Sequence, residues 1–192
     1  MRQSCPFHTS DDVPGVRNPD DGSYRFECDE PGHPAPGPYR WLQVPEPPGM
    51  SGLGGLAEEL DMPTRLVDAL RSLGEGWFEY GLVERAYALA HPDDFRQLVE
   101  RWGHTANAPK EYTASTYIGS LLGRMTRAAD VFYRADRGTG RWSYNRNSSY
   151  WSLDPQAPWE DRTTWVSVID DDAQADRVAD LACRAYVPGA KD

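Results

Sequence analysis

The chain has 192 residues, enough for one compact domain of about 100 to 150 residues with small appendages. Its 30 acidic and 20 basic side chains give a net charge of −10, which argues against a uniformly basic nucleic-acid-binding protein. Residues 95–150 reverse this balance with nine bases and four acids, so a local basic patch can still contact phosphate. An odd number of cysteines, no signal peptide and no membrane-spanning apolar run predict a cytoplasmic protein without structural disulfides.

Four candidate metal ligands lie within the first 33 residues, in a Cys-x2-His and a Cys-x4-His pair: Cys5, His8, Cys28 and His33. Ligands two to four residues apart can share one tight turn, and two such turns complete a tetrahedron. The proline, glycine and aspartate around them cannot form a hydrophobic core, whereas zinc contributes on the order of 10 kcal/mol to small modules. Residues 1–35 are therefore predicted to form a structural zinc module with a short strand at residues 23–26. The alternative is a disordered tail with coincidental cysteines and histidines.

The motif Cys5-Pro6-Phe7-His8 resembles the beginning of the zinc ribbon of bacterial replicative primases. That ribbon ends in a Cys-x2-Cys pair, whereas in this chain Cys28 is followed by His33. The resemblance implies a zinc ribbon and leaves the fourth ligand open between His33 and the carboxylates of Asp29 or Glu30. No primase-like catalytic sequence follows, so no polymerase activity is implied.

Proline and glycine dominate residues 36–55, which predicts a linker. Residues 56–155 are predicted to be a helical and winged-helix domain. It begins with two short helices at 56–73. Three further helices follow, at 77–90, at 92–102 and from Thr113 or Ser115 onward. Two strands follow at 131–134 and 142–145, joined by a glycine-rich turn that contains Arg137 and Arg141. Residues 156–192 are predicted to be an extension with a strand at 164–169 and a helix at 173–186.

Residues 78–153 resemble winged helix-turn-helix DNA-binding domains in their order of three helices and a hairpin. The resemblance implies that the last helix enters the major groove of double-stranded DNA and that the hairpin contacts phosphates or the minor groove. The predicted DNA contacts are the polar and basic side chains on and around these two elements. They are Lys110, Thr113, Ser115, Thr116, Ser120, Arg124, Arg127, Arg137 and Arg141.

Taken together, the patterns predict an α+β, mainly helical protein with an N-terminal zinc knuckle and a winged helix-turn-helix domain. The function they favour is DNA binding, as a transcriptional regulator or an accessory factor in phage, plasmid or defence biology. The alternative is a zinc-dependent protein–protein interaction module, or a homodimer, that binds no nucleic acid. An enzyme has the least support, because the chain has no nucleophile elbow and no paired-carboxylate-and-lysine motif. His104, alone in a loop, is expected to be structural.

Overall fold

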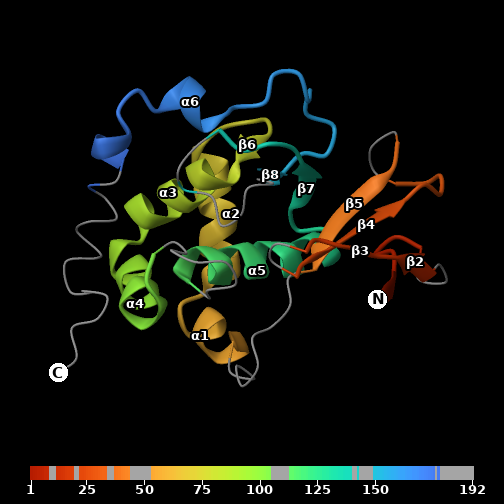
Figure 1. The fold of residues 1–192 in the computed structure, drawn as a ribbon, viewed down its shortest axis with the longest axis horizontal. Coiled ribbons are helices and arrows are strands. Elements are labelled where there is room, and N and C mark those ends of the chain that lie inside the picture. Colours follow the sequence, from red (N-terminus) through yellow and green to blue (C-terminus); the bar gives the residue numbers. More distant parts are fainter. Residues whose placement is uncertain are drawn as a thin grey trace.

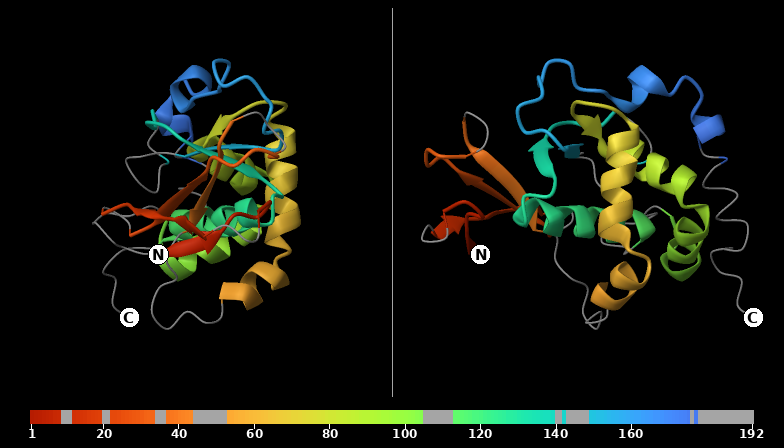
Figure 2. Two further views of the ribbon diagram at one scale, coloured as in Figure 1. Left: turned by 90° about the vertical axis from the view of Figure 1, so that its right-hand side faces the viewer. Right: turned by 180° about the vertical axis from the view of Figure 1, so that it is seen from behind.

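The computed structural model describes residues 1–8, 12–19, 22–33, 37–43, 53–104, 113–139, 142, 149–175 and 177. The architecture is mixed α/β, with small antiparallel sheets beside a group of helices (Figure 1). The N-terminal sheets lie beyond one end of α5, and α2 stands against that helix (Figure 2). Within the described residues, no helix is both long and apolar enough to span a lipid bilayer.

The N-terminal module consists of two small antiparallel sheets. Its strands are β1 (Arg2–Ser4), β2 (Asp12–Pro14), β3 (Val16–Arg17), β4 (Tyr24–Cys28) and β5 (Tyr39–Gln43). Strand β1 pairs with β2, and the other three form a sheet in the order β3-β4-β5. The strand predicted at residues 23–26 is confirmed as β4. Along it, Phe26 and Cys28 are buried and Glu27 is exposed, as the two-residue period of a strand requires.

Strand β5 corrects the predicted linker at residues 36–55. It pairs with β4 along its whole length and buries Tyr39, Trp41 and Leu42. The Tyr39 hydroxyl donates a hydrogen bond to the carbonyl oxygen of Thr126 in the helical domain, and Leu42 belongs to the core of that domain. The prolines flank a strand, and this strand docks the module onto the helices. Residues 34–36 and 44–52 lie outside the described residues.

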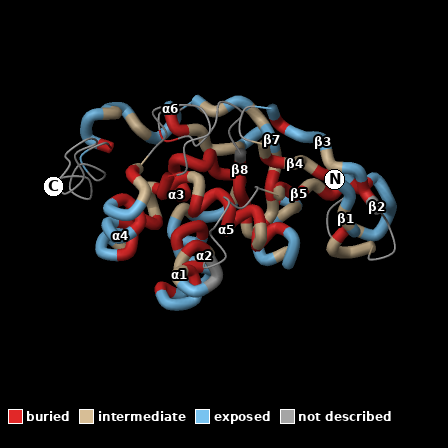
Figure 3. The backbone as a smooth tube through the Cα atoms, turned by 60° about the horizontal axis from the view of Figure 1, so that its bottom comes forward, coloured by how far each residue is buried: buried red, intermediate tan, exposed pale blue. Residues whose placement is uncertain are grey.

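The helices occupy the predicted positions. They are α1 (Leu53–Glu59), α2 (Met62–Ser72), α3 (Tyr80–Ala90), α4 (Pro92–Trp102) and α5 (Ala114–Arg127). Pro63 lies in the first turn of α2, and Gly74 follows its end with a φ of 101°, a left-handed conformation that favours glycine. Helix α5 is the centre of the core, because 11 of its 14 residues are buried and it contacts α2, α3, α4, β5 and β7. Figure 3 shows the buried backbone gathered around α5, α3 and α2.

A hairpin follows α5, but its second strand is not the predicted one. The strands are β7 (Phe132–Ala135) and β8 (Ser149–Ser152), with β6 (Phe78–Glu79) on the other side of β8. Of the predicted strand at 142–145 the structure describes only Trp142, which lies in no strand. Its indole stacks on Phe95 with ring centroids 6.1 Å apart and contacts Trp165. Trp142 packs in the helical core, and residues 143–145 lie outside the described residues.

The predicted strand at residues 164–169 is also wrong. This segment forms the short helix α6 (Trp165–Val168), in which the Ser167 hydroxyl accepts a hydrogen bond from the Thr164 N–H. Trp165 is buried, whereas Val166 and Val168 are exposed. The β-branched residues that favour a strand therefore face solvent, and a serine cap with one buried indole determines the local structure. The helix predicted at 173–186 lies largely outside the described residues.

Two buried tyrosines predict an alkaline loss of stability. Burial, and then the charges of Glu79 and Asp136, raise the pKa of Tyr150 to about 12. Burial, and then the carboxylate of Asp94, raise the pKa of Tyr87 as well. Because an unfolded tyrosine has a pKa of about 10, the stability from these phenols is complete below that pH and is lost as the pH rises through the folded-state values.

Urea unfolding at about pH 9 and about pH 11 measures this loss. The expected result is a lower unfolding free energy at the higher pH, with a smaller difference in Tyr150→Phe. Equal differences in Tyr150→Phe and the parent chain would contradict the assignment to Tyr150.

Candidate metal centre

The structure brings the four predicted metal ligands together at one end of the N-terminal module. Cys5 directly follows β1, and the His8 N–H donates a 3.1 Å hydrogen bond to the Cys5 carbonyl oxygen, which forms the first turn. Cys28 ends β4, and His33 lies in the loop between β4 and β5. One ligand atom from each of the four residues lies within 4.8 Å of all the others.

The distances between ligand atoms suit a tetrahedral metal ion. The Cys5 Sγ lies 3.5 Å from the His33 Nε2, and the Cys28 Sγ lies 3.4 Å from the His8 Nδ1. Metal–sulfur and metal–nitrogen bonds of about 2.3 and 2.0 Å at a tetrahedral angle separate the two ligand atoms by about 3.5 Å. Within the described residues neither Cys5 nor Cys28 forms a disulfide, and both are buried. The site therefore offers two thiol and two imidazole ligands at the spacing that a bound ion needs.

The fourth member of the cluster is His33, and neither Asp29 nor Glu30 belongs to it. Both carboxylates are exposed, while the His33 Nδ1 is buried and has no hydrogen-bond partner among the described residues. An imidazole in that position is held by packing against Phe7, whose ring centroid is 5.8 Å away. Of the candidates that spacing alone left open, the cluster contains the histidine and neither carboxylate.

Tyr39 connects the cluster to the helical domain. Its ring lies 5.6 Å from that of His33 and 4.8 Å from that of Phe7. Burial, and then the charge of Cys5, raise the pKa of the Tyr39 hydroxyl. The phenol therefore stays protonated and keeps its hydrogen bond to the Thr126 carbonyl oxygen. Tyr39 therefore contacts both the cluster and the end of α5.

The chain was compared with protein-family models, curated proteins and solved structures. None of them matches. The resemblances of residues 5–8 to a primase zinc ribbon and of residues 78–153 to a winged helix therefore stay predictions.

Three of the predicted DNA contacts on α5 are buried. Ser115 donates to both carboxylate oxygens of Glu84 at 2.7 and 3.0 Å. Ser120 donates to the Thr116 carbonyl oxygen at 2.8 Å, and Thr113 accepts from the Thr116 N–H as the helix cap. The predicted role of Thr113, Ser115 and Ser120 as base readers is corrected, because the protein core covers their hydroxyls.

The other predicted contacts lie at separate places. Thr116 and Arg124 are half-buried on α5. Arg127 is exposed at the end of α5 and donates a 3.0 Å hydrogen bond to the Gln43 Oε1 of the N-terminal module. Arg137 is exposed beside Asp136, whose carboxylate accepts its N–H. Lys110 and Arg141 lie outside the described residues. Among the predicted DNA contacts that the structure describes, the exposed arginines are Arg127 at the end of α5 and Arg137 in the segment that follows β7.

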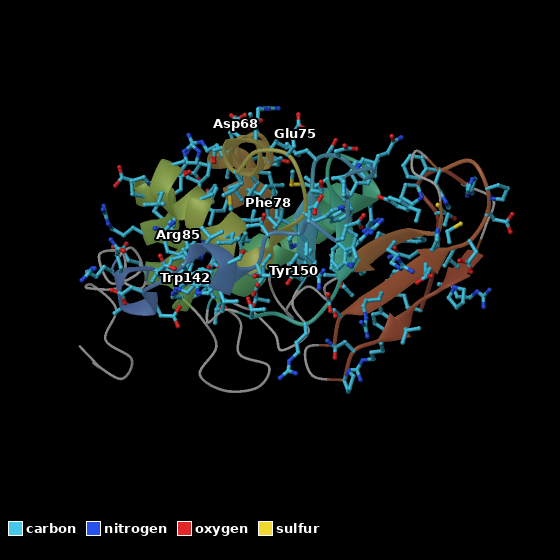
Figure 4. The ribbon with its side chains drawn as sticks, turned by 90° about the horizontal axis from the view of Figure 1, so that it is seen from above. Asp68, Glu75, Phe78, Arg85, Trp142 and Tyr150 are labelled. Carbon is cyan, nitrogen blue, oxygen red and sulfur yellow. The ribbon has the colours of Figure 1, made fainter. Side chains whose placement is uncertain are left out.

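Sequence reasoning missed a buried polar group around Glu84. The His104 Nε2 lies 3.1 Å from the Glu84 Oε1, and the same carboxylate accepts from Ser115. The His104 ring lies edge-on to Trp142 at 4.5 Å. Figure 4 shows Trp142 on the helical side of the molecule, next to the segment that carries α6. The carboxylate lies between the imidazole and the hydroxyl, whereas in a Ser-His-Asp triad the imidazole lies between the other two groups.

Proposed function

We propose that this chain is a zinc-containing DNA-binding protein in which a structural zinc ion orders the N-terminal module and the segment after β7 contacts double-stranded DNA. The observation that carries the DNA-binding part is the order of α3, α4, α5, β7 and β8. This order supports a winged-helix domain with three helices followed by a hairpin. Arg137, exposed just after β7, is in place for a phosphate contact.

Zinc is the metal that this set of ligands suits best. Two thiolates and two imidazoles in a tetrahedron are a common structural zinc site, and softer or harder ligand sets would favour other ions. Four protein ligands leave no position open for substrate or water, so the role is structural. Cys5, His8, Cys28 and His33 would hold the ion, which would join the turn after β1 to the end of β4.

DNA contact falls to the exposed arginines, since the α5 hydroxyls are buried. Arginine contacts to phosphate fix position and affinity but carry no sequence information. A chain with a net charge of −10 repels a duplex outside such a local patch. We therefore place the protein among transcriptional regulators or accessory factors whose non-specific affinity for DNA is modest.

Fluorescence anisotropy with a labelled random-sequence duplex tests this proposal. The zinc-loaded protein is expected to bind more weakly at physiological than at low salt, because phosphate contacts release counterions. Arg137→Ala/Arg141→Ala is expected to weaken binding and to reduce the salt slope by about 2, or roughly one for each lost contact.

The matched control is Arg71→Ala/Arg96→Ala, which removes the same charge from two exposed arginines that pair with Asp68 and Asp93. Equal weakening by both double variants would show a general charge effect and count against the contact after β7. No binding at micromolar protein in low salt would refute the proposal and favour the protein-interaction alternative.

A further inference from the structure

A pocket lies at the junction between the N-terminal module and the helical domain. We name it the junction pocket. From the module it is lined by Tyr39 and Arg40, and from the domain by Trp77, Phe132 and Arg134. Strand β5 packs against β7 here, and the rings of Tyr39 and Phe132 meet edge to face at 6.2 Å. Both parts of the chain are needed to form the pocket.

Arg134 in this pocket contacts two indoles, Trp77 and Trp159, which themselves meet edge to face. Its guanidinium carbon lies 4.8 Å from the centroid of Trp77 and 5.3 Å from that of Trp159. Cation–π attraction of this kind favours arginine over lysine, because the planar guanidinium stacks on the ring faces. Trp77 is itself fixed by a 2.9 Å hydrogen bond from its Nε1 to the Ala157 carbonyl oxygen. The guanidinium therefore has a defined position before any ligand arrives.

The two neighbouring arginines have carboxylate partners. Arg40 forms a two-pronged ion pair with Glu27 at 2.8 and 2.9 Å, and Arg162 lies 3.2 Å from the Asp136 carboxylate. For Arg134, no carboxylate among the described residues lies within the 4 Å of an ion pair. Its nitrogens are thus available to an anion from outside the chain.

The surroundings of Arg134 destabilise its protonated, positively charged form when no anion is bound. Burial, and then the positive charge of Arg40, lower the pKa of Arg134, while Glu160 acts in the opposite direction. A cation that has lost part of its water without gaining an anion is destabilised. A bound anion would relieve both effects, since it would pair with Arg134 and offset the charge of Arg40.

We propose that the junction pocket is a phosphate-binding site, in which the guanidinium of Arg134 pairs with phosphate oxygens while Trp77 and Trp159 hold it in position. The planar guanidinium matches two phosphate oxygens in a bidentate pair. The phosphate can come from the backbone of a nucleic-acid strand or from a free phosphate compound. The site stands on the geometry of Arg134 and does not depend on duplex binding by the segment after β7.

Titration of the zinc-loaded protein with two probes tests the site, with tryptophan fluorescence and calorimetry as the measurements. The probes are inorganic pyrophosphate and an unphosphorylated single-stranded oligonucleotide. Because two indoles contact Arg134, a bound phosphate is expected to change tryptophan emission in a saturable way. Arg134→Gln is expected to weaken binding by about tenfold or more. The phosphate affinity of Arg134→Lys is expected to lie between those of the parent chain and Arg134→Gln, because lysine keeps the charge and loses the planar guanidinium.

Arg96→Gln is the matched control, since Arg96 is exposed on α4 and pairs with Asp93, and it should bind phosphate like the parent chain.

Binding of pyrophosphate identifies a free phosphate as a sufficient ligand, and binding of the oligonucleotide alone identifies the strand backbone. Either result supports the site if Arg134→Gln weakens that binding by about tenfold or more. No signal with either probe at millimolar concentration, or parental affinity in Arg134→Gln or Arg134→Lys, overturns it. Arg137→Ala/Arg141→Ala should keep pyrophosphate binding, which separates failure of this site from failure of duplex binding.

Discussion

Replacing Cys28 by serine is expected to remove the bound metal and to unfold the N-terminal module. Among the described residues, the core of this module contains six buried residues: Cys5, Val13, Phe26, Cys28, Tyr39 and Trp41. A core of this size does not stabilise a fold by itself, whereas zinc binding contributes on the order of 10 kcal/mol. Without one thiolate, the ion and the free energy it supplies are lost together.

The helical domain is expected to remain folded in Cys28→Ser but to become less stable. Strand β5 contributes Leu42 to the helical core, and full burial of a leucine side chain is worth about 1.5 to 3 kcal/mol. Loss of the module also removes the hydrogen bond from Tyr39 to Thr126. Two unfolding steps are therefore expected in the zinc-loaded parent chain, and one weakened step in the variant and in the chelated parent chain.

Metal content per chain and near-ultraviolet circular dichroism measure the effect. Trp41 is fully buried and stacks on Phe26 with ring centroids 5.1 Å apart, so its signal reports the packing of the module. Cys183→Ser is the control, because this third cysteine belongs to neither ligand pair. His33→Ala is expected to behave like Cys28→Ser, and Asp29→Asn/Glu30→Gln like the parent chain. Full zinc content in Cys28→Ser would contradict the assignment.

The metal cluster could be predicted because each half of it is local. Two ligands three residues apart, Cys5 and His8, share one turn, and Cys28 and His33 lie close together in the same way. The helices could be predicted for a similar reason, since their apolar periodicity and the signals at Pro63 and Gly74 lie within each segment. What the spacing did not decide was the fourth ligand, which depends on how the loop after β4 folds back.

The role of α5 could not be predicted from its pattern of polar residues. Serine and threonine on a helix are usually assigned to the solvent side, but their hydroxyls can bond to the preceding turn. Ser120 donates to the Thr116 carbonyl oxygen and Thr126 donates to that of Gly123, each at 2.8 Å. Once the hydroxyls are satisfied within the helix, that face can be buried at little cost. A helix expected to enter a DNA groove is in this way the centre of the core.

The two errors in the C-terminal half have a common cause. Residues 142–145 alternate apolar and polar side chains, and residues 164–169 are rich in β-branched and aromatic side chains, both of which are typical of strands. In each, one tryptophan enters the helical core, and the rings of Trp142 and Trp165 lie 5.7 Å apart. Their neighbour Gly81 makes room for this pair, since a Cβ there would lie 2.8 Å from the Trp165 ring and 2.7 Å from the Trp142 carbonyl oxygen. Packing between distant segments overrides the local preference.

Replacing Glu79 by glutamine is expected to destabilise the helical domain. Glu79 is fully buried. Its Oε1 accepts the Thr139 N–H at 2.7 Å, and its Oε2 accepts the Thr139 hydroxyl at 2.6 Å and the Trp165 N–H at 2.7 Å. The amide nitrogen of glutamine cannot accept a hydrogen bond, so at least one buried donor is left unsatisfied at a cost of about 1 to 3 kcal/mol. Glu79→Ala removes every acceptor and is expected to cost about 3 to 5 kcal/mol.

Equilibrium unfolding in urea measures both variants. The matched control is Glu75→Gln, an exposed glutamate four residues earlier in the same segment, for which a change of less than about 0.5 kcal/mol is expected. Thr139→Val removes the hydroxyl, which donates to Glu79 and accepts from the Val166 N–H at 3.3 Å, and should cost about 1 kcal/mol. Glu79 joins β6 to residue 139 after β7 and to the start of α6, which are 60 and 86 residues away. Equal stability of Glu79→Gln and Glu75→Gln would show that these three segments are held by packing alone. The expected difference would assign their arrangement, and with it the position of Arg137 two residues before Thr139, to one buried carboxylate.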